Sequence, residues 1–453
     1  MSCHLAVDIG ASSGRLIIGL YNNEKLELEE VYRFKNQLVS TNGRSCWDLN
    51  GLFNQILEGM RQCKAAGYLP ETIGIDTWGC DYVLLDQDQT PIDHPIAYRD
   101  DRHEQSAASF LNKYSCEGLY AVNGLQYQPF NTLFQLYQDE RLKQAETFLM
   151  VPDYLNFLLS GKTCNEYTNL STSGLLDCKK RKPSIELLEA AGISSNLLCP
   201  VTPVGKVIGD LRPEVAQSVG FECKVIAVPS HDTASAYLAS PFKDQIILSS
   251  GTWSLLGAIL DEPIIEEAAR AVNFTNEGCA NGQIRLLKNV MGLWIIQEVL
   301  RNLGSRYSFA KLIELAREDP YEEIFDVNKS CFLHPDNMVK TIQEDYRERG
   351  IEPPVTPGQI ADAVYRSLAN AYRQAVLELE NLTGKTYSAI NIIGGGCQNG
   401  YLNELIAKET GKTVLAGPVE ATAIGNLLAQ IHAADDNILC QSILENSFQP
   451  KTY

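Results

Sequence analysis

The chain has 453 residues, 45% hydrophobic and 21% charged, a composition typical of a globular protein and a length that favours two domains over one core. Its formal net charge of −18 argues against non-specific binding to nucleic acid or to an anionic membrane surface. No apolar run reaches the roughly 18 residues that cross a bilayer, and no basic segment followed by an apolar stretch opens the chain. We therefore expect a cytoplasmic protein without membrane or nucleic-acid partners.

The first half of the chain predicts apolar strands at its start and a mixture of helices and strands after them. Pro152 falls in the first turn of one predicted helix, where its missing N–H costs nothing. The expected strands lie at 4–10, 14–21 and 25–35, on both sides of a glycine turn within Thr72–Asp86 (TIGIDTWGCDYVLLD), and at Val225–Val228. The expected helices lie at 49–66, 103–113, 131–142 and 150–160, and one more begins at Ser230.

The pattern then restarts with a second hairpin at Gln245–Leu260. Further elements follow as helices near 292–303, 308–317 and 358–383, a strand at Ser388–Ile393, a helix at 399–410, a strand at Thr413–Leu415 and a helix from Val419. Meandering strands followed by helical crossovers favour a mixed α/β sheet in each half. We place the boundary near Ser240–Lys243, which gives domains 1–240 and 241–453.

Each half contains one glycine-hinged hairpin, Leu5–Leu20 (LAVDIGASSGRLIIGL) and Ile246–Leu260 (IILSSGTWSLLGAIL). Glycine permits tight turns and close approach to the backbone, and small hydroxyl residues leave donors free to face an oxyanion. Two such hairpins could grip a polyphosphate, although either one alone is more often an ordinary Gly/Ser hairpin. Asp8 ends the first strand, where a carboxylate can hold Mg²⁺ through water.

The segment SHDT at 230–233 follows a buried strand and opens a helix. Ligand crevices of α/β sheets lie at such carboxyl ends of strands. Asp232 could there accept the proton of a substrate hydroxyl that attacks a γ-phosphate, with His231 as its hydrogen-bonding neighbour. The alternative is that Ser230 or Asp232 only caps the helix.

Other polar and glycine-rich positions are weaker candidates. Asp76 ends an apolar strand and either shares the metal neighbourhood or caps a turn, while Trp78 and Gly79 offer a flat apolar wall and bare backbone to a sugar. Asn289 could bond sugar hydroxyls, and Gly394–Gly396 could let a nucleotide approach a helix N-terminus. Arginines that could neutralise phosphate, although solvated arginines are commoner, are Arg15, Arg99 and Arg102.

Several familiar motifs are missing from the sequence. It contains no G-x-x-x-x-G-K-[ST], which excludes a P-loop enzyme, and no G-x-G-x-x-G opens a helix after the first strand, which disfavours a Rossmann dehydrogenase. Its 13 cysteines are scattered without a C-x-x-C pair, so neither a zinc site nor a disulfide framework is expected.

Taken together, the motifs resemble the FGGY family of carbohydrate kinases from Leu5 to about Ile431. The segments that carry the resemblance are DIGASSGR, GIDTWGCDYVLLD, AYRDDR, PFNTLFQL, VPDYLNFLLSGK, EYTNLSTSGLLD, SHDTASA, LSSGTWSLLG, LKNVMGLW and IIGGGCQN. The resemblance implies two actin-like, ribonuclease-H-like ATPase domains with a catalytic cleft between them. The N-terminal domain would bind sugar and phosphate, the C-terminal domain would bind nucleotide, and the two would close on substrate.

The resemblance also implies roles for particular residues. Asp232 would be the general base, and Asp8 would hold Mg²⁺ through water. The expected sugar contacts are Gly79, His231, Asp232, Thr233 and Asn289. The expected ATP contacts are Ala11, Ser12, Ser13, Gly14, Arg15, Thr252, Gln297 and Gly395.

The implied reaction moves the γ-phosphoryl group of MgATP to the 1-hydroxyl of a ketose. Many family members have GGHD where this chain has SHD at 230–232, and that departure favours L-rhamnulose as the acceptor, with another deoxy-ketose such as L-fuculose as the alternative. An actin-like or chaperone-like ATPase and a sugar-responsive regulator are alternatives from other classes. The first needs a partner-binding module and the second a basic nucleic-acid-binding segment, and neither is apparent.

Overall fold

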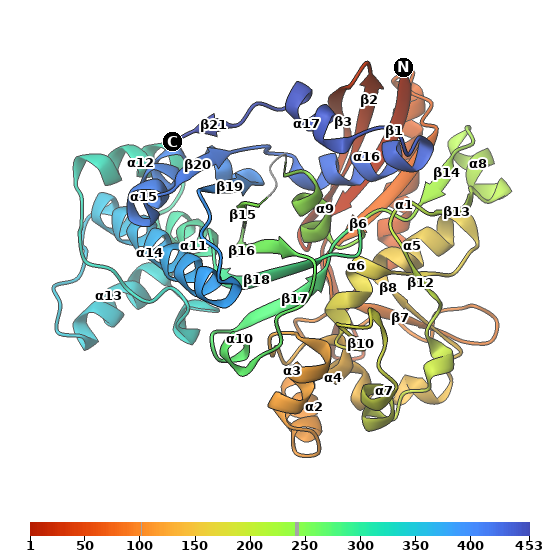
Figure 1. The fold of residues 1–453 in the computed structure, drawn as a ribbon, viewed down its shortest axis with the longest axis horizontal. Helices are drawn as coiled ribbons and strands as arrows, with labels where there is room; N and C mark the ends of the chain where they lie inside the picture. The colour runs from red at the N-terminus through yellow and green to blue at the C-terminus, as the bar shows by residue number, and fades with distance from the viewer. Residues whose placement is uncertain (101, 241–243) are drawn as a thin grey trace. The chain divides into compact units, whose positions relative to one another are not determined.

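The computed structural model describes residues 1–100, 102–240 and 244–453, and these form two compact units (Figure 1). Unit 1 comprises Met1–Pro241, Ile259–Leu286 and Ala421–Gln449, and unit 2 comprises Phe242–Ala258, Leu287–Glu420 and Pro450–Tyr453. The predicted domains 1–240 and 241–453 are continuous stretches of sequence, and this division stays a prediction. Three residues of the expected boundary, 241–243, lie outside the described residues.

Unit 1 is built on a six-stranded sheet in the order β13-β14-β6-β1-β2-β3. The strands are β1 (Ser2–Ile9), β2 (Ser13–Asn22), β3 (Lys25–Lys35), β6 (Thr72–Thr77), β13 (Val207–Asp210) and β14 (Lys224–Ile226). Strand β1 runs antiparallel to β2 and parallel to β6, which sets Asp8 beside both Arg15 and Asp76. The predicted first hairpin is therefore confirmed, and its turn lies at residues 10–12.

Helices cover both faces of this sheet, and the alternation of side chains along each strand decides which residue meets which helix. Helices α1 (Leu49–Ala65) and α5 (Val151–Ser160) share an apolar cluster with odd-numbered residues of β1, among them Val7. The even-numbered residues of β1 point the other way, toward α16 (Ala421–Ala434), which contacts β1, β6 and α9 (Asp232–Leu238). Asp8 and Asp76 therefore lie on the α16 face.

Helix α16 packs unusually closely on α9, the helix that begins at Asp232 (Figure 1). A Cβ atom added at Gly425 would lie 1.8 Å from the carbonyl oxygen of Ser235 and 2.6 Å from its carbon. Both atoms belong to the backbone, so neither can move without displacing a helix.

We expect Gly425→Ala to lower the free energy of unfolding by more than about 2 kcal/mol, because overpacking against backbone forces the two helices apart. Turnover should fall as well, since α9 carries Asp232. Denaturant unfolding measures the first effect. The matched control is Gly118→Ala in α3 (Cys116–Asn123), where the nearest atoms are side-chain atoms at 3.2 Å or more. Equal stability of the two variants would contradict the prediction.

A second apolar cluster of unit 1 contains residues of β7, of β8 and of the short elements packed around them. Strand β7 pairs with β8 rather than with β6, so the predicted strand–turn–strand of Thr72–Asp86 is two strands in separate sheets. The remaining strands of unit 1 are β4 (Leu38–Thr41), β5 (Arg44–Trp47), β7 (Tyr82–Leu85), β8 (Thr147–Met150), β9 (Asn165–Glu166), β10 (Leu176–Asp177), β11 (Lys182–Pro183), β12 (Val201–Thr202) and β17 (Phe274–Gly278). Its remaining helices are α2 (Arg102–Leu111), α4 (Thr132–Tyr137), α6 (Tyr167–Leu170), α7 (Ile185–Ala191), α8 (Pro213–Val219), α10 (Glu267–Ala271) and α17 (Cys440–Ser447).

In unit 2, β15 (Ile246–Ser250) pairs antiparallel with β16 and parallel with β19. This confirms the second predicted hairpin. The other strands are β16 (Trp253–Leu260) and β18 (Ile284–Met291), whose residues are divided between the units, β19 (Ala389–Ile393), β20 (Thr413–Ala416) and β21 (Lys451–Thr452). The helices are α11 (Trp294–Leu303), α12 (Phe309–Glu318), α13 (Met338–Glu348), α14 (Pro357–Thr383) and α15 (Gly400–Thr410).

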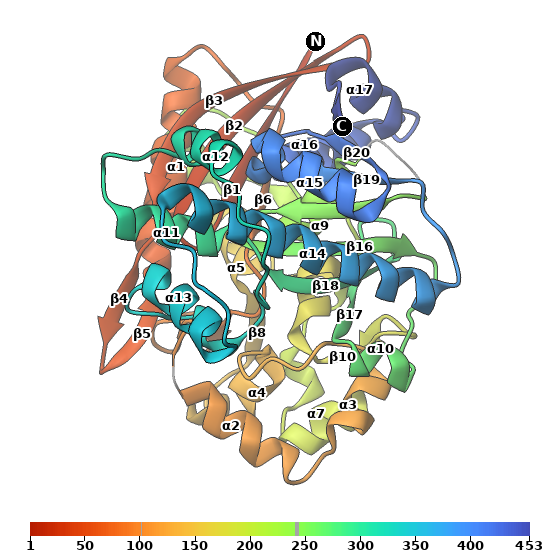
Figure 2. The same cartoon turned by 90° about the vertical axis from the view of Figure 1, so that its left-hand side faces the viewer.

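The long helix α14 contacts α11, α12 and α15 (Figure 2). Its ends follow from the sequence, because Thr356 and Gln359 form a capping box, Pro357 opens the first turn, and Gly384 ends the helix in the left-handed region. The thirteen cysteines are all free. Within the described parts of the chain, no helix is long and apolar enough to cross a membrane.

Candidate active site

The ends of β1 and β6 bring two carboxylates and one arginine together on the α16 face. Asp8 is paired with Asp76 in the parallel register and with Arg15 in the antiparallel register. Arg15 donates to Oδ2 of Asp8 from Nε at 2.9 Å and from Nη2 at 2.8 Å. Arg15 was predicted to contact ATP, and in the structure this part of its guanidinium is held by Asp8.

Asp76 is completely buried, and burial together with the charge of Asp8 raises its pKa well above the ordinary value. Nδ2 of Asn426 donates to Oδ2 of Asp76 at 2.6 Å, whereas Oδ1 has no hydrogen-bond partner. Gln430 donates to Oδ1 of Asn426 at 2.7 Å, and Thr72 donates to Oε1 of Gln430 at 2.6 Å. This series of hydrogen bonds leads from Thr72 through two residues of α16 to Asp76, so α16 supports the buried carboxyl group.

The turn after β6 is shaped by buried contacts. The ring of Trp78 packs 4.2 Å from that of Trp47, and Nε1 of each donates to Oδ2 of Asp81, at 2.9 and 2.6 Å respectively. Trp78 is only 7% exposed, so it belongs to the core and does not form the open wall that the sequence suggested. Gly79 is half-buried, and a Cβ there would lie 2.8 Å from Oγ1 of Thr172.

Cys80, next to Gly79, has φ 75°, in the left-handed region. Its carbonyl oxygen accepts from Oγ1 of Thr132 at 2.7 Å and from Gln135 at 3.2 Å, which holds this backbone in place. Burial and the neighbouring carboxylates raise the pKa of the thiol far above its ordinary value, so Cys80 is not suited to be a nucleophile.

Two buried residues tie this turn to the segment 230–233, and the sequence reasoning missed both. Glu166 accepts from the backbone N–H of Ser230 at 3.0 Å and from its hydroxyl at 2.7 Å, and it also accepts from Thr168 and Asn169. Asn169 donates to the carbonyl oxygens of Trp78 at 3.3 Å and of Ser230 at 3.1 Å. The only sequence signal for this bridge is the motif EYTNLSTSG, which contains both residues.

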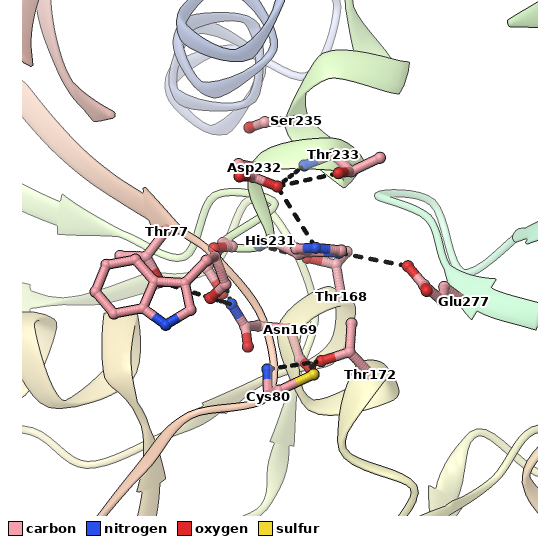
Figure 3. Close-up of polar contacts among 12 residues, drawn as sticks. Thr77, Cys80, Thr168, Asn169, Thr172, His231, Asp232, Thr233, Ser235 and Glu277 are labelled. Carbon is pink, nitrogen blue, oxygen red and sulfur yellow. Dashed lines mark hydrogen bonds and ion pairs between the residues drawn. The ribbon is translucent and has the colours of Figure 1, made fainter. Parts of the chain in front are cut away.

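His231 and Asp232 stand at the start of α9, beside the end of β6, to which a bridge from Thr77 to His231 connects them (Figure 3). Oδ1 of Asp232 accepts from both the N–H and the hydroxyl of Thr233. Among the residues that the structure describes, no group donates a hydrogen bond to Oδ2. Burial, and next the charge of Asp8, raise the pKa of Asp232 to about 6.

The His231 ring lies between Asp232 and the ion pair of Glu277 and Arg285, two residues that are distant from it in the sequence. Its Nε2 lies 3.5 Å from Oδ1 of Asp232, and its Nδ1 lies 3.5 Å from Oε2 of Glu277 (Figure 3). Arg285, which is completely buried, donates to Nδ1 at 3.0 Å and to Glu277 at 2.8 Å. Neither Glu277 nor Arg285 was singled out by the sequence, because neither belongs to a local motif that links it to His231.

The turn between β1 and β2 leaves small residues at the surface next to Asp8. Ser12 is exposed and Ala11 and Ser13 are half-buried, while the Gly10 N–H donates to the Ser13 carbonyl at 2.9 Å and closes the turn. Gly14 is buried under the ring of Phe34, and a Cβ atom at this position would lie 2.2 Å from that ring. Of the residues predicted to contact phosphate at this hairpin, Ser12 is therefore exposed, Ala11, Ser13 and Arg15 are half-buried, and Gly14 is buried by packing.

In unit 2 the predicted nucleotide residues gather around the turn from β15 to β16. Thr252 is exposed in this turn, and its carbonyl oxygen accepts from the N–H of Trp294 at 3.2 Å. Gln297 lies one turn further along α11 and is half-buried. Gly395 is exposed and follows β19, which lies directly beside β15.

Asn289, the glycines after β19 and two arginines are the other candidates, and the structure shows their surroundings. Asn289 lies within strand β18, before α11 begins at Trp294. Gly396 packs closely on Ser250, since a Cβ there would lie 2.0 Å from Oγ of Ser250, whereas a Cβ at Gly395 would meet no atom of the described residues within 4 Å. The other two arginines contact their own neighbours: Arg99 donates to Tyr98 at 3.0 Å, and Arg102 forms an ion pair with Asp139 at 3.9 Å.

The donor set at Asp8 suits a magnesium ion that is held largely by water and phosphate. Asp8 offers a hard carboxylate oxygen, and Asp76 lies beside it on the next strand with an Oδ1 that has no hydrogen-bond partner among the described residues. Across residues 1–100, 102–240 and 244–453, no group of three or more His, Cys, Asp or Glu is arranged to hold a metal. Mg²⁺ commonly uses one or two carboxylates together with waters and substrate phosphates, so these residues fit such a site.

Comparison with known proteins covers the whole chain. Models of the N-terminal and C-terminal domains of the FGGY family of carbohydrate kinases match residues 3–239 and 246–434. A rhamnulokinase of Halalkalibacterium halodurans is 45% identical, with 100% of this chain and 99% of the relative covered. A rhamnulokinase of Oceanobacillus iheyensis is 43% identical, with 100% and 98% covered.

Solved structures with low sequence identity share the fold. A gluconate kinase from Lactobacillus acidophilus has a TM-score of 0.84 at 16% identity and covers 100% of this chain and 93% of its own. A xylulose kinase from the same organism has a TM-score of 0.83 at 16% identity, with 100% and 94% covered. The chain belongs to the FGGY family of carbohydrate kinases, ATP-dependent enzymes built from two actin-like, ribonuclease-H-like domains.

Proposed function

We propose that this enzyme phosphorylates L-rhamnulose with ATP to give L-rhamnulose 1-phosphate, in the cytoplasmic breakdown of L-rhamnose. The sugar is proposed from the relatives at 45% and 43% identity, both rhamnulokinases that align along the whole chain. The observation that carries the chemistry is Asp232, whose Oδ1 is engaged by Thr233 while Oδ2 accepts no hydrogen bond from residues 1–100, 102–240 or 244–453.

Asp232 is proposed as the general base. Its raised pKa of about 6 lies close to neutral pH, which suits a base because it combines ionisation with affinity for a proton. Oδ2 would take the proton of the sugar 1-hydroxyl as the hydroxyl oxygen attacks the γ-phosphorus of ATP, and the bond to the ADP oxygen breaks. In this proposal Glu166 and Asn169 hold Ser230 in place and so fix the start of α9.

The remaining residues are proposed to bind the two substrates. Gly79, with no side chain, would let the sugar lie against the backbone, and His231 and Thr233 would flank it. Asn289 would add a sugar contact. The proposed ATP contacts are Ala11, Ser12, Ser13, Gly14, Arg15, Thr252, Gln297 and Gly395. Mg²⁺ bound through water at Asp8 would neutralise phosphate charge.

A panel of acceptors tests the proposal. ATP turnover is measured with L-rhamnulose, L-fuculose, L-xylulose and glycerol, each at several concentrations. We expect the largest kcat/KM with L-rhamnulose. A larger kcat/KM with L-fuculose would show that the enzyme is a kinase for that deoxy-ketose, and turnover with none of the four would refute the assignment to this group of sugars.

A further inference from the structure

Arg285 is completely buried within unit 1, which is an unusual place for a charged side chain. Its Nη2 serves two acceptors, Glu277 at 2.8 Å and His231 at 3.0 Å, and its guanidinium lies 5.9 Å from the ring centre of Tyr237. Nε and Nη1 are buried and have no hydrogen-bond partner within the described part of the chain. Two unpaired donors on a buried charge cost stability, and an apolar side chain of similar size would avoid that cost.

The contact with His231 determines where that ring carries its hydrogen. Arginine is always protonated and can only donate, so Nδ1 of His231 must be the acceptor. In the neutral imidazole the hydrogen then sits on Nε2, the nitrogen that lies 3.5 Å from Oδ1 of Asp232. Burial and the Arg285 charge both lower the pKa of His231 well below its ordinary value, which keeps the ring neutral.

Without Arg285, the other charged groups around the His231 ring would favour a different protonation state of that ring. Glu277 lies 3.5 Å from Nδ1 and Asp232 lies 3.5 Å from Nε2, and beyond them Asp8 and Glu166 are also acidic. Without Arg285, a hydrogen on Nδ1 would face the Glu277 carboxylate. The ring would then be either an imidazolium ion or the tautomer that turns a lone pair toward Asp232.

We propose that Arg285 is a positioning residue for the phosphoryl-transfer reaction: it fixes the Nε2–H tautomer of His231, which directs that N–H toward Oδ1 of Asp232 and leaves Oδ2 to take the substrate proton. The proposal rests on the proposed role of Asp232 as the base. Glu277 holds Arg285 in position and balances its charge. The sequence of contacts therefore runs from Glu277 through Arg285 and His231 to the base.

Nitrogen NMR of the enzyme labelled with ¹⁵N-histidine tests the tautomer directly. The chain has 6 histidines, and the signals of His231 are identified by their loss in His231→Gln. At pH 7 we expect Nδ1 of His231 to be unprotonated and Nε2 to carry the hydrogen. A protonated Nδ1 in the parent enzyme would overturn the proposal, whatever happens in any variant.

Arg285→Met then tests the consequence. Nδ1 should gain a hydrogen, and kcat should fall about 10- to 100-fold with the KM for ATP unchanged, since the base loses its orientation but the nucleotide residues remain. The matched control is Arg141→Met, which removes another inward-facing arginine of unit 1, paired with Asp139 at 2.6 Å. It should lower stability without changing the His231 signals.

An unprotonated Nδ1 in a folded Arg285→Met enzyme, or an unchanged kcat, would also overturn the proposal. If Asp232 is not the base, Asp232→Asn will retain its turnover while the tautomer measurement still reports on Arg285. The two failures can therefore be told apart.

Discussion

Replacing Asp232 with asparagine is expected to lower turnover about 10²- to 10⁴-fold, the usual contribution of a general base. Asparagine keeps the shape of the side chain, and its carbonyl oxygen can still accept from the N–H and hydroxyl of Thr233. What it loses is an oxygen that can bind a proton. Steady-state kinetics should show the fall in kcat with little change in the KM for ATP, and near-parental turnover would remove Asp232 from the mechanism.

The pH dependence of the parent enzyme provides a second measurement of the same group. The base must be ionised, and burial together with Asp8 raises its pKa to about 6, so kcat/KM should fall as the pH drops below about 6. A carboxyl group whose folded pKa lies above its unfolded value costs folding free energy at higher pH. Asp232→Asn should therefore be no less stable than the parent at pH 7, which separates lost chemistry from lost folding.

Replacing Asp8 with alanine is expected to lower turnover at a fixed, moderate Mg²⁺ concentration by about 100-fold, because a hard cation near the phosphates contributes several kcal/mol. The variant also releases Arg15, which bonds Oδ2 of Asp8 through Nε and Nη2. Titration of Mg²⁺ at constant ATP should show a weaker apparent affinity for the ion. Calorimetry should show unchanged sugar binding, since Asp8 lies beside the turn that is proposed to bind phosphate.

Asp88→Ala is the matched control for Asp8→Ala, because Asp88 is an exposed aspartate of the same unit, in the turn after β7. It should leave both the Mg²⁺ dependence and the turnover unchanged. If Asp8→Ala also retains the parental affinity for MgATP and the parental turnover, Asp8 does not belong to the site.

Short local motifs in the sequence were sufficient to predict the fold family and to select several candidate site residues. The turn residues around Asp8, the turn at Gly79 and the segment 230–233 are each contiguous, so their residue types and order carry the information. Long helices were predicted well for the same reason: α14 has its capping box, proline and terminal glycine within the chain segment itself. Whether the site candidates act as proposed stays a prediction.

Predictions failed where a distant contact overrode the local pattern. The helix expected at 131–142 ends at Tyr137, because Asp139 caps a separate 3₁₀ turn and is held by Arg141 and by the hydroxyl of Tyr82. Trp78 seemed free to face a sugar in the sequence, but the fold packs it on Trp47. The hydroxyl of Tyr82 and the ring of Trp47 are distant in the sequence from the residues they hold, so neither contact is visible in the local segment.

The sequence by itself determined the family, the two hairpins and the acidic residues at the strand ends, because these depend on short segments whose spacing is fixed by the backbone. Only the tertiary structure revealed the groups that hold these residues. Arg285 reaches His231 across 54 positions, Glu166 reaches Ser230 across 64, and Asn426 reaches Asp76 across 350. A single polar residue in an apolar strand or helix has no local signature, because its role depends on which buried group the fold places opposite it.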